Sequence, residues 1–504
     1  MVRPDFAQTT GPALLTDHAA ARFLDQATFG PTPASIAQLQ QMGINSWLAA
    51  QFALNTSDLP DQPILGSDGK ANTNLGPVQA AFFQNAVTGQ DQLRQRIAFA
   101  LSEIWVVSRQ SGVRYAYAFP PYWRVLRDNA FGNYRDIIEA VTLNPAMGRY
   151  LNMANNNKAN PAKGTAANEN YAREMMQLFT LGLVQLNSDG STAGVPTYDQ
   201  SVVTNMAKVL TGWTYPTVPG VGARGDNPEY FFGQMFAVEQ NHDTSAKTIF
   251  GNITIPGGQT AAQDLESLLD ALMQQPTMAP FVSKQLIQHL VTSNPSPGYV
   301  QRVSSVFLND GTGVTGNMQA VITAILTDPE ARTNDDPGVT VNPSFGHMRE
   351  PVLFLANILR GLNGTLAAGN TVNNYASELG QNLFNEPSVF SYFSPQYRTE
   401  GGLLGPEFQI YTTATAADRA NVVNAALYGT LSNSAAIDLS SFLQQGSSVA
   451  GMLDYISYVF LHHTMPADLM QAATAAASAA NSPKAQVQAA LYTVLTSGEY
   501  QIIQ

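Results

Sequence analysis

The chain has 504 residues, of which 44% are hydrophobic and 12% are charged, and it contains no cysteine. Its 25 Lys and Arg against 37 Asp and Glu give a formal net charge of −12, which argues against nucleic acid or an anionic membrane surface as a partner. The absence of cysteine excludes disulfides, thiolate nucleophiles, zinc–cysteine sites and iron–sulfur clusters. The length predicts two or three domains or one large helical assembly, and the hydrophobic content is ample for their cores.

The N-terminal residues Met1–Phe6 lack the apolar run that is typical of a signal peptide. No apolar stretch approaches the roughly 18 to 20 residues that a membrane-spanning helix needs, so we expect no membrane span. Two kinds of protein fit these features: a cytoplasmic protein, or a mature exported protein whose signal was replaced by a start Met. The low charge and the many Asn, Gln, Ser, Thr and Gly residues favour the exported protein.

Helical periodicity dominates the N-terminal region, residues 1–150. Its clearest helix covers 92–108, which has one apolar face. The other face carries charged side chains, at Arg94, Arg96 and Glu103. Further helices are expected at 20–28, 32–43, 44–52 and 121–150.

The central region, 151–345, contains a motif helix at 168–183 and a Gly/Pro-rich insertion at 214–260. Short β-like runs at 247–250 and 253–255 predict a hairpin within that insertion. Further helices are expected at 261–275, 279–292, 297–308 and 316–328. In the C-terminal region, 346–504, we expect a helix at 347–361, a loop region at 362–410 and a helical tail. The predicted fold is therefore mainly α, a large multi-helix assembly with long Gly/Pro-rich loops and a small β-hairpin element.

The densest polar cluster lies on the motif helix. Asn170, Arg173 and Glu174 fall within one arc of about 100° around the helix axis, and Glu169 lies four residues before Arg173, where the two can pair. One interpretation makes Glu174 or Glu169 an acid/base group whose pKa Arg173 tunes, with Asn170 binding substrate. The alternative is a solvated helix face with one ion pair.

A second cluster, in the Gly/Pro-rich insertion, contains His242, Asp243 and Lys247. A His beside an Asp suits a general base or a single metal ligand, and Lys247 is then a substrate-binding candidate. The alternative is a loop in which Asp243 makes a turn hydrogen bond and His242 is exposed. Apart from His462–His463, the six histidines show no paired metal-ligand spacing, so we predict no metal and no cofactor.

Arg349 and Glu350 precede a predicted helix, where Glu suits the helix dipole and Arg does not. This mismatch indicates a specific partner for Arg349, either an internal carboxylate or a substrate group, and both residues are substrate-binding candidates. The loop at 385–393 places polar side chains next to aromatic ones, a composition typical of a sugar-binding groove but also of a large helical core. The chain contains no GxSxG, P-loop or dinucleotide-binding motif.

These clusters, in this order, resemble a bacterial family catalogued as domain of unknown function 1800. The resemblance rests on motifs at 20–32, 92–102, 130–135, 144–151, 169–182, 242–243, 290–297, 349–351, 387–390 and 406–408. It implies an exported protein, periplasmic or extracellular, because members typically begin with an export signal. It also implies a sulfatase-like exported partner, because genes for such proteins often lie beside those of the family, but it brings no established reaction. The sequence departs from the family at Asn168, His289 and His347, which argues against a catalytic role for these positions.

Two functions follow as hypotheses. The first is a hydrolase or lyase that acts on an extracellular polysaccharide-like polymer by carboxylate acid/base chemistry. Glu169 and Glu174 lie about 140° apart around a helix, so a second carboxylate is expected from elsewhere, such as Asp243 or Glu350. The second is a non-catalytic secreted binding or assembly protein that works with the sulfatase-like partner, its Glu and Arg clusters joining helices.

Overall fold

The computed structural model describes residues 15–251, 253–336, 342, 344–429, 431–445 and 448–504. The segment Met1–Phe6, from which the absence of a signal peptide was inferred, lies outside these residues. The fold is mainly α-helical, as predicted, and its strands form short two-stranded antiparallel sheets. Within the described ranges, no helix is both long enough and apolar enough to cross a membrane.

The N-terminal helices are more numerous than the periodicity predicts. They are α1 (Asp17–Ala27), α2 (Pro33–Met42), α3 (Ile44–Ala53), α4 (Gly76–Thr88), α5 (Gln92–Ile104), α6 (Phe119–Asn129), α7 (Tyr134–Thr142) and α8 (Pro145–Tyr150), with 3₁₀ turns η1 (Arg109–Ser111) and η2 (Ala116–Ala118). The expected helix 121–150 is divided into α6, α7 and α8 because Asn133 and Asn144 each cap a new helix.

The central region contains the predicted hairpin, in which β5 (Lys247–Ile249) pairs with β6 (Ile253–Ile255). The motif helix begins as α9 (Asn170–Glu174) and continues as a π-helix, η4 (Met175–Thr180). Two further antiparallel pairs are β1 (Val184–Leu186) with β2 (Thr192–Pro196) and β3 (Trp213–Thr214) with β4 (Phe236–Ala237). The remaining elements are η3 (Pro161–Lys163), α10 (Gln200–Val209), η5 (Glu239–Asn241), α11 (Ala261–Met273), α12 (Met278–Leu290), α13 (Pro297–Leu308), α14 (Met318–Thr327), α15 (Pro329–Arg332) and η6 (Thr333–Asp335).

The C-terminal region joins its own two ends. Strand β7 (His347–Met348) pairs with β10 (Ile502–Ile503), so the helix expected from residue 347 begins only at Pro351. The other strand pair is β8 (Thr365–Leu366) with β9 (Ala435–Ala436). The helices are α16 (Pro351–Gly361), α17 (Val372–Glu378), η7 (Pro406–Ile410), α18 (Thr413–Tyr428), α19 (Ser440–Gln444), α20 (Val449–Ile456), the π-helix η8 (Ser457–Leu461), α21 (Ala467–Ser478), α22 (Pro483–Leu495) and α23 (Gly498–Gln501).

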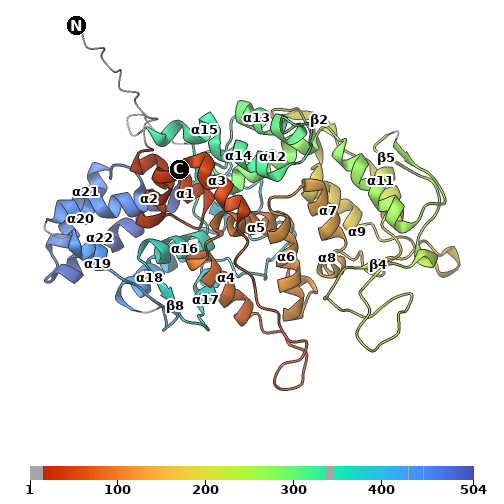
Figure 1. Cartoon of the computed structure of the whole chain (residues 1–504), viewed down its shortest axis with the longest axis horizontal. Coiled ribbons are helices and arrows are strands. Elements are labelled where there is room, and N and C mark those ends of the chain that lie inside the picture. Colours follow the sequence, from red (N-terminus) through yellow and green to blue (C-terminus); the bar gives the residue numbers. More distant parts are fainter. Residues whose placement is uncertain (1–14, 252, 337–341, 343, 430, 446–447) are drawn as a thin grey trace, which may run out of the picture.

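Helix α5 occupies the middle of the molecule (Figure 1), where it packs against α3, α4, α6 and α12. Helices α19 to α22 form one end of the molecule, and β4, β5 and α11 lie toward the other. The buried apolar side chains of all three predicted regions belong to one contiguous cluster. The division at residues 150 and 345 stays a prediction. The candidate site forms where the C-terminal end of α5 meets α12, η4 and the loop that precedes η7.

Candidate functional site

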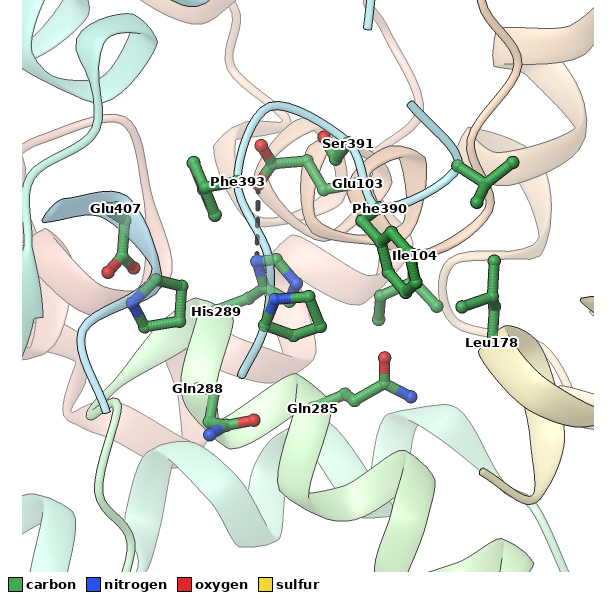
Figure 2. A pocket seen from close by; sticks show the side chains of 13 residues that line it. Glu103, Ile104, Leu178, Gln285, Gln288, His289, Phe390, Ser391, Phe393 and Glu407 are labelled. Atoms are coloured by element: carbon green, nitrogen blue, oxygen red, sulfur yellow. Dashed lines mark ion pairs between the residues drawn. The ribbon is translucent and has the colours of Figure 1, made fainter. Parts of the chain in front are cut away.

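A pocket opens between segments that lie far apart in the sequence. Its space, including the open mouth, is about 550 Å³, but the enclosed part has room for only a few water molecules. Figure 2 shows Glu103 and His289 pointing toward each other, with Glu407 and Leu178 on opposite sides. The lining residues are Glu103 and Ile104 of α5, Leu178 of η4, Gln285, Gln288 and His289 of α12, Val389, Phe390, Ser391, Phe393 and Pro395 of the loop, and Pro406 and Glu407 of η7.

Three features of the backbone and side chains around the pocket each lower the stability of the fold. Glu103 lies in the last turn of α5, where a negative charge opposes the helix dipole. Ser391 has a φ of 62° and a buried hydroxyl that lacks a hydrogen-bond partner among the described residues. Leu178 belongs to a π-helix, a form frequent at functional sites. Such features persist where the surrounding structure holds them, and they cluster at functional sites.

Two buried carboxyl groups form the centre of the site. The side-chain amide of Gln381 donates to Glu103 Oε1 over 3.1 Å and to Glu350 Oε2 over 2.5 Å, and so bridges them. Burial raises the pKa of Glu103 to about 8, although the charge of Arg96 opposes this rise. The pKa of Glu350 also lies well above its ordinary value, because of burial and the charge of Glu103. Both groups therefore hold protons more strongly than ordinary carboxyls.

His289 connects this pair to the pocket opening. Its Nδ1 lies 3.3 Å from Glu103 Oε2, within ion-pair distance but without hydrogen-bond geometry. The His289 side chain is 18% exposed, whereas that of Glu103 is 2% exposed. Burial lowers the pKa of His289, so the ring is neutral near pH 7. The buried guanidinium of Arg96 donates to the His289 carbonyl, and its Nε and Nη1 have no partner among the described residues.

Two more carboxyl groups border the pair. His347 Nδ1 lies 3.1 Å from Glu407 Oε1, and Glu407 Oε2 has no hydrogen-bond partner within the described ranges. Tyr392 donates to Glu386 Oε1 over 3.0 Å, and burial raises the pKa of Glu386 to about 7. Across the described part of the chain, no group of three or more His, Asp or Glu side chains is arranged to hold a metal ion. The site is thus a cluster of poorly solvated carboxyl groups.

The family model described as "Protein of unknown function (DUF1800)" matches residues 22–502. The chain belongs to this family. The match confirms the resemblance drawn from the motifs, and it includes every segment that lines the pocket. No curated protein and no solved structure matches the chain.

In this DUF1800 chain, the motif helix places its charged residues at the surface. Glu169 Oε2 lies 3.1 Å from Arg173 Nη2, and both side chains are more than 30% exposed. The amide of Asn170 donates to Asn152. Glu174 is half-buried, burial raises its pKa, and its Oε2 has no hydrogen-bond partner among the described residues.

The second predicted cluster is divided between buried and exposed positions. His242 is fully buried, with Nε2 3.0 Å from Asp264 Oδ2 and Nδ1 2.9 Å from the carbonyl of Thr211. Lys247 also pairs with Asp264 and is buried. Asp243 accepts hydrogen bonds from Ser245 in a turn. The partner of His242 is therefore Asp264 and not the adjacent Asp243.

The consecutive residues Arg349 and Glu350 join different clusters. Arg349 forms two hydrogen bonds of 2.8 Å to the internal carboxylate of Asp25, whereas Glu350 lies in the pair with Glu103. The sequence interpretation missed Glu103, Gln381 and Glu407 as site residues, and it argued against His289. A usable signal was the charged face of α5, because a chain with 12% charged residues places Arg94, Arg96 and Glu103 on one central helix.

Proposed function

We propose that the pocket at Glu103 is the active site of a hydrolase or lyase that works by carboxyl acid/base chemistry. The observation that carries this proposal is a buried carboxyl with a pKa raised to about 8, facing a half-buried His at a pocket that opens to solvent. Strongly perturbed carboxyls in a cleft are typical of catalytic acids. A purely structural Glu would be expected to pair with Arg96 by direct hydrogen bonds, which these two side chains do not form.

In the hydrolytic form of the proposal, Glu103 is the general acid. It is protonated at pH 7, so it can give its proton to the leaving oxygen as the bond to carbon breaks. The resulting carboxylate gains the hydrogen bond from Gln381 and the nearby charge of Arg96. Glu407, which lines the same pocket, takes a proton from the water whose oxygen bonds to that carbon.

A polysaccharide-like substrate fits the pocket wall. Phe390 is 41% exposed at the pocket and presents a ring on which a sugar can stack, while Gln285 and Gln288 offer amide groups for hydroxyls. The narrow interior supports entry of one group of the substrate while the rest of the polymer lies outside. The sequence analysis made Glu174 an acid/base candidate, but it does not line the pocket. Because it precedes Leu178 of the pocket wall by four residues, we assign it instead a substrate-binding role at the pocket edge.

An extracellular or periplasmic location and a sulfatase-like exported partner belong to the same proposal. They rest on the resemblance alone, since members of the family typically begin with an export signal. A protein at that location meets polymers of the cell surface and its surroundings, which suits the proposed substrate class.

The test is a screen of extracellular polysaccharides with the wild type, Glu103→Gln and the matched control Glu378→Gln. Glu378 is exposed on α17 and lies outside the pocket. We expect fragments from the wild type and the control, and a loss of about 10²-fold or more in Glu103→Gln, since the amide cannot donate the proton. Full activity in a folded Glu103→Gln variant, or no product from the wild type on any polymer, would favour the non-catalytic binding protein.

A further inference from the structure

A second cleft collects three of the six histidines of the chain, His18, His462 and His463. It lies between the start of α1 and the segment 457–465 that includes η8, and its space, including the open mouth, is about 780 Å³. Tyr458, Met465 and Met470 give it an apolar wall. None of its lining residues lines the pocket at Glu103, so the two are separate features.

A smaller pocket, called the narrow end here, shares His462 and His463 with the cleft and is also lined by Arg22, Asp25, Arg349, Glu499 and Gln504. Arg22 and Asp25 follow His18 by four and seven residues on α1, a spacing that places all three side chains on one helical face. One face of α1 therefore lines both the wide and the narrow part of the cleft.

Arg22 lines this narrow end, and one edge of its guanidinium has no hydrogen-bond partner among the described residues. Its side chain is 4% exposed, and its Nη1 pairs with Asp335. Its Nε and Nη2 have no hydrogen-bond partner among the described residues. These two nitrogens form the side of the guanidinium that binds a carboxylate with two parallel hydrogen bonds. In this protein, Arg302 uses the same pair of nitrogens to bind Asp328 over 2.7 Å each.

The two acidic side chains nearest to Arg22 in the described structure already have guanidinium partners. Asp25 is bound at both oxygens by Arg349, and Asp335 is shared between Arg22 and Arg332. Two buried guanidiniums thus share the carboxylate of Asp335 among the residues that the structure describes. Glu499 lies 3.8 Å from His463 Nε2 and is 40% exposed, at the outside of the narrow end.

His462 provides a further polar atom at the same place. Its φ of 62° is the left-handed conformation that non-glycine residues rarely adopt, and it ends the π-helix η8. Its Nε2 is buried, has no hydrogen-bond partner among the described residues, and lies 3.7 Å from Asp25 Oδ2. His462 and Arg22 thus both line the narrow end, and each has a buried nitrogen without a hydrogen-bond partner among the described residues.

We propose that the narrow end binds the carboxylate group of an acidic organic molecule whose body lies in the wide cleft. Arg22 donates both hydrogen bonds of its free edge to the carboxylate, and the ring of His463, which also lines the narrow end, lies on the outer side. Asp17 and Asp454 are exposed at the wide cleft, and their charges favour a monoanion over a multiply charged ligand. The apolar wall and the hydroxyl of Tyr458 suit an uncharged body that carries hydroxyl groups.

The test measures the melting temperature of the full chain in sodium glucuronate, acetate, sulfate and chloride at equal ionic strength. We expect glucuronate at millimolar concentration to raise the melting temperature of the wild type by several degrees, acetate to raise it less, and chloride and sulfate not to raise it further. Arg22→Gln should abolish the difference between glucuronate and chloride. Arg114→Gln, an exposed Arg outside the cleft, should retain it.

The remaining outcomes decide against the proposal. An equal shift in wild type and Arg22→Gln means that the carboxylate binds elsewhere, and no shift in the wild type means that it does not bind. Equal shifts with acetate and glucuronate overturn the role of the wide cleft, and equal shifts with chloride overturn the preference for carboxylate. If Arg22→Gln does not fold, His463→Gln replaces it, because that side chain is 21% exposed, and saturation-transfer NMR of glucuronate provides the readout.

Discussion

Arg349 and Glu350 are adjacent in the chain, and each is the centre of a different buried cluster. Arg349 binds Asp25 at the narrow end of the second cleft, which contains His18, His462 and His463. Glu350 shares the amide of Gln381 with Glu103 behind the candidate active site. Both residues lie between β7, which pairs with the C-terminal strand β10, and the first turn of α16. This junction therefore fixes the two sites relative to each other.

The Asp25–Arg349 pair predicts a large stability effect. Asp25→Asn leaves the guanidinium of Arg349 buried without a counter-charge, and it weakens the hydrogen bond from Asn357. We expect the free energy of unfolding to fall by about 3 to 5 kcal/mol, the range for breaking one side of a buried ion pair. Urea unfolding measures it. Glu169→Gln, which breaks a surface pair, should cost less than about 1 kcal/mol, and equal losses in the two variants would contradict the prediction.

The Glu103–Glu350 pair predicts a dependence of stability on pH. The pKa of Glu103 is about 8 in the folded protein against 4.5 for an ordinary Glu. The folded state therefore binds more protons than the unfolded state between these values, and its stability falls as the pH rises from about 4.5 to about 8.

Glu103→Gln removes this loss. From pH 5 to pH 8, the free energy of unfolding of the variant should rise relative to that of the wild type by on the order of a few kcal/mol. Urea unfolding at several pH values measures this difference. Glu378→Gln is the control, because its side chain is exposed on α17. A constant difference between wild type and Glu103→Gln across this range would show that the carboxyl is not held protonated.

The sequence predicted α5 well but did not show what covers its charged face. Periodicity located the helix because its apolar residues recur at the helical spacing, and it gave no partner for Arg96 or Glu103. In the structure α12 and Gln381 cover that face. Arg96 contacts His289, which lies 193 positions away in the chain, and Glu103 contacts Gln381, which lies 278 positions away. Single-sequence patterns contain no information on such distant partners. The hairpin β5–β6 was predictable because its strands are separated by only a short turn.

The same lack of information on distant partners explains why the sequence pointed to residues that are adjacent in the chain. His242 and Asp243 are adjacent in the sequence, but adjacent side chains on an extended segment point to different sides. His242 reaches Asp264 of α11, 22 residues away. Glu103, His289 and Glu407 form a pocket only because α5, α12 and η7 converge, which the order of helices along the chain does not specify.

The His242–Asp264–Lys247 network predicts a structural effect. Asp264→Asn leaves Lys247 buried, 1% exposed, without its counter-charge, so we expect a loss of about 3 to 5 kcal/mol in the free energy of unfolding. Asp243→Asn is the matched control, since Asp243 accepts its hydrogen bonds in a turn, and it should cost about 1 kcal/mol or less. Chemical denaturation compares them. A larger loss for Asp243→Asn than for Asp264→Asn would show that the adjacent Asp243, and not Asp264, is the important partner of His242.

Glu174→Gln distinguishes a substrate contact from a structural one. Burial raises the pKa of Glu174, and its Oε2 has no hydrogen-bond partner among the described residues, so the charged form gains little from the fold. The folded state binds the proton more tightly than the unfolded state, so stability falls as the pH rises through that raised pKa, and the Gln variant escapes this loss.

We expect the melting temperature of Glu174→Gln at pH 7 to equal or slightly exceed that of the wild type, with a change in the free energy of unfolding within about 1 kcal/mol. Thermal melts at pH 5 and pH 7 measure it, and a fall of several degrees at pH 7 would mean that Glu174 has a structural partner. With the fold unchanged, a higher KM for the polymer at unaltered kcat would identify Glu174 as a binding residue beside Glu103.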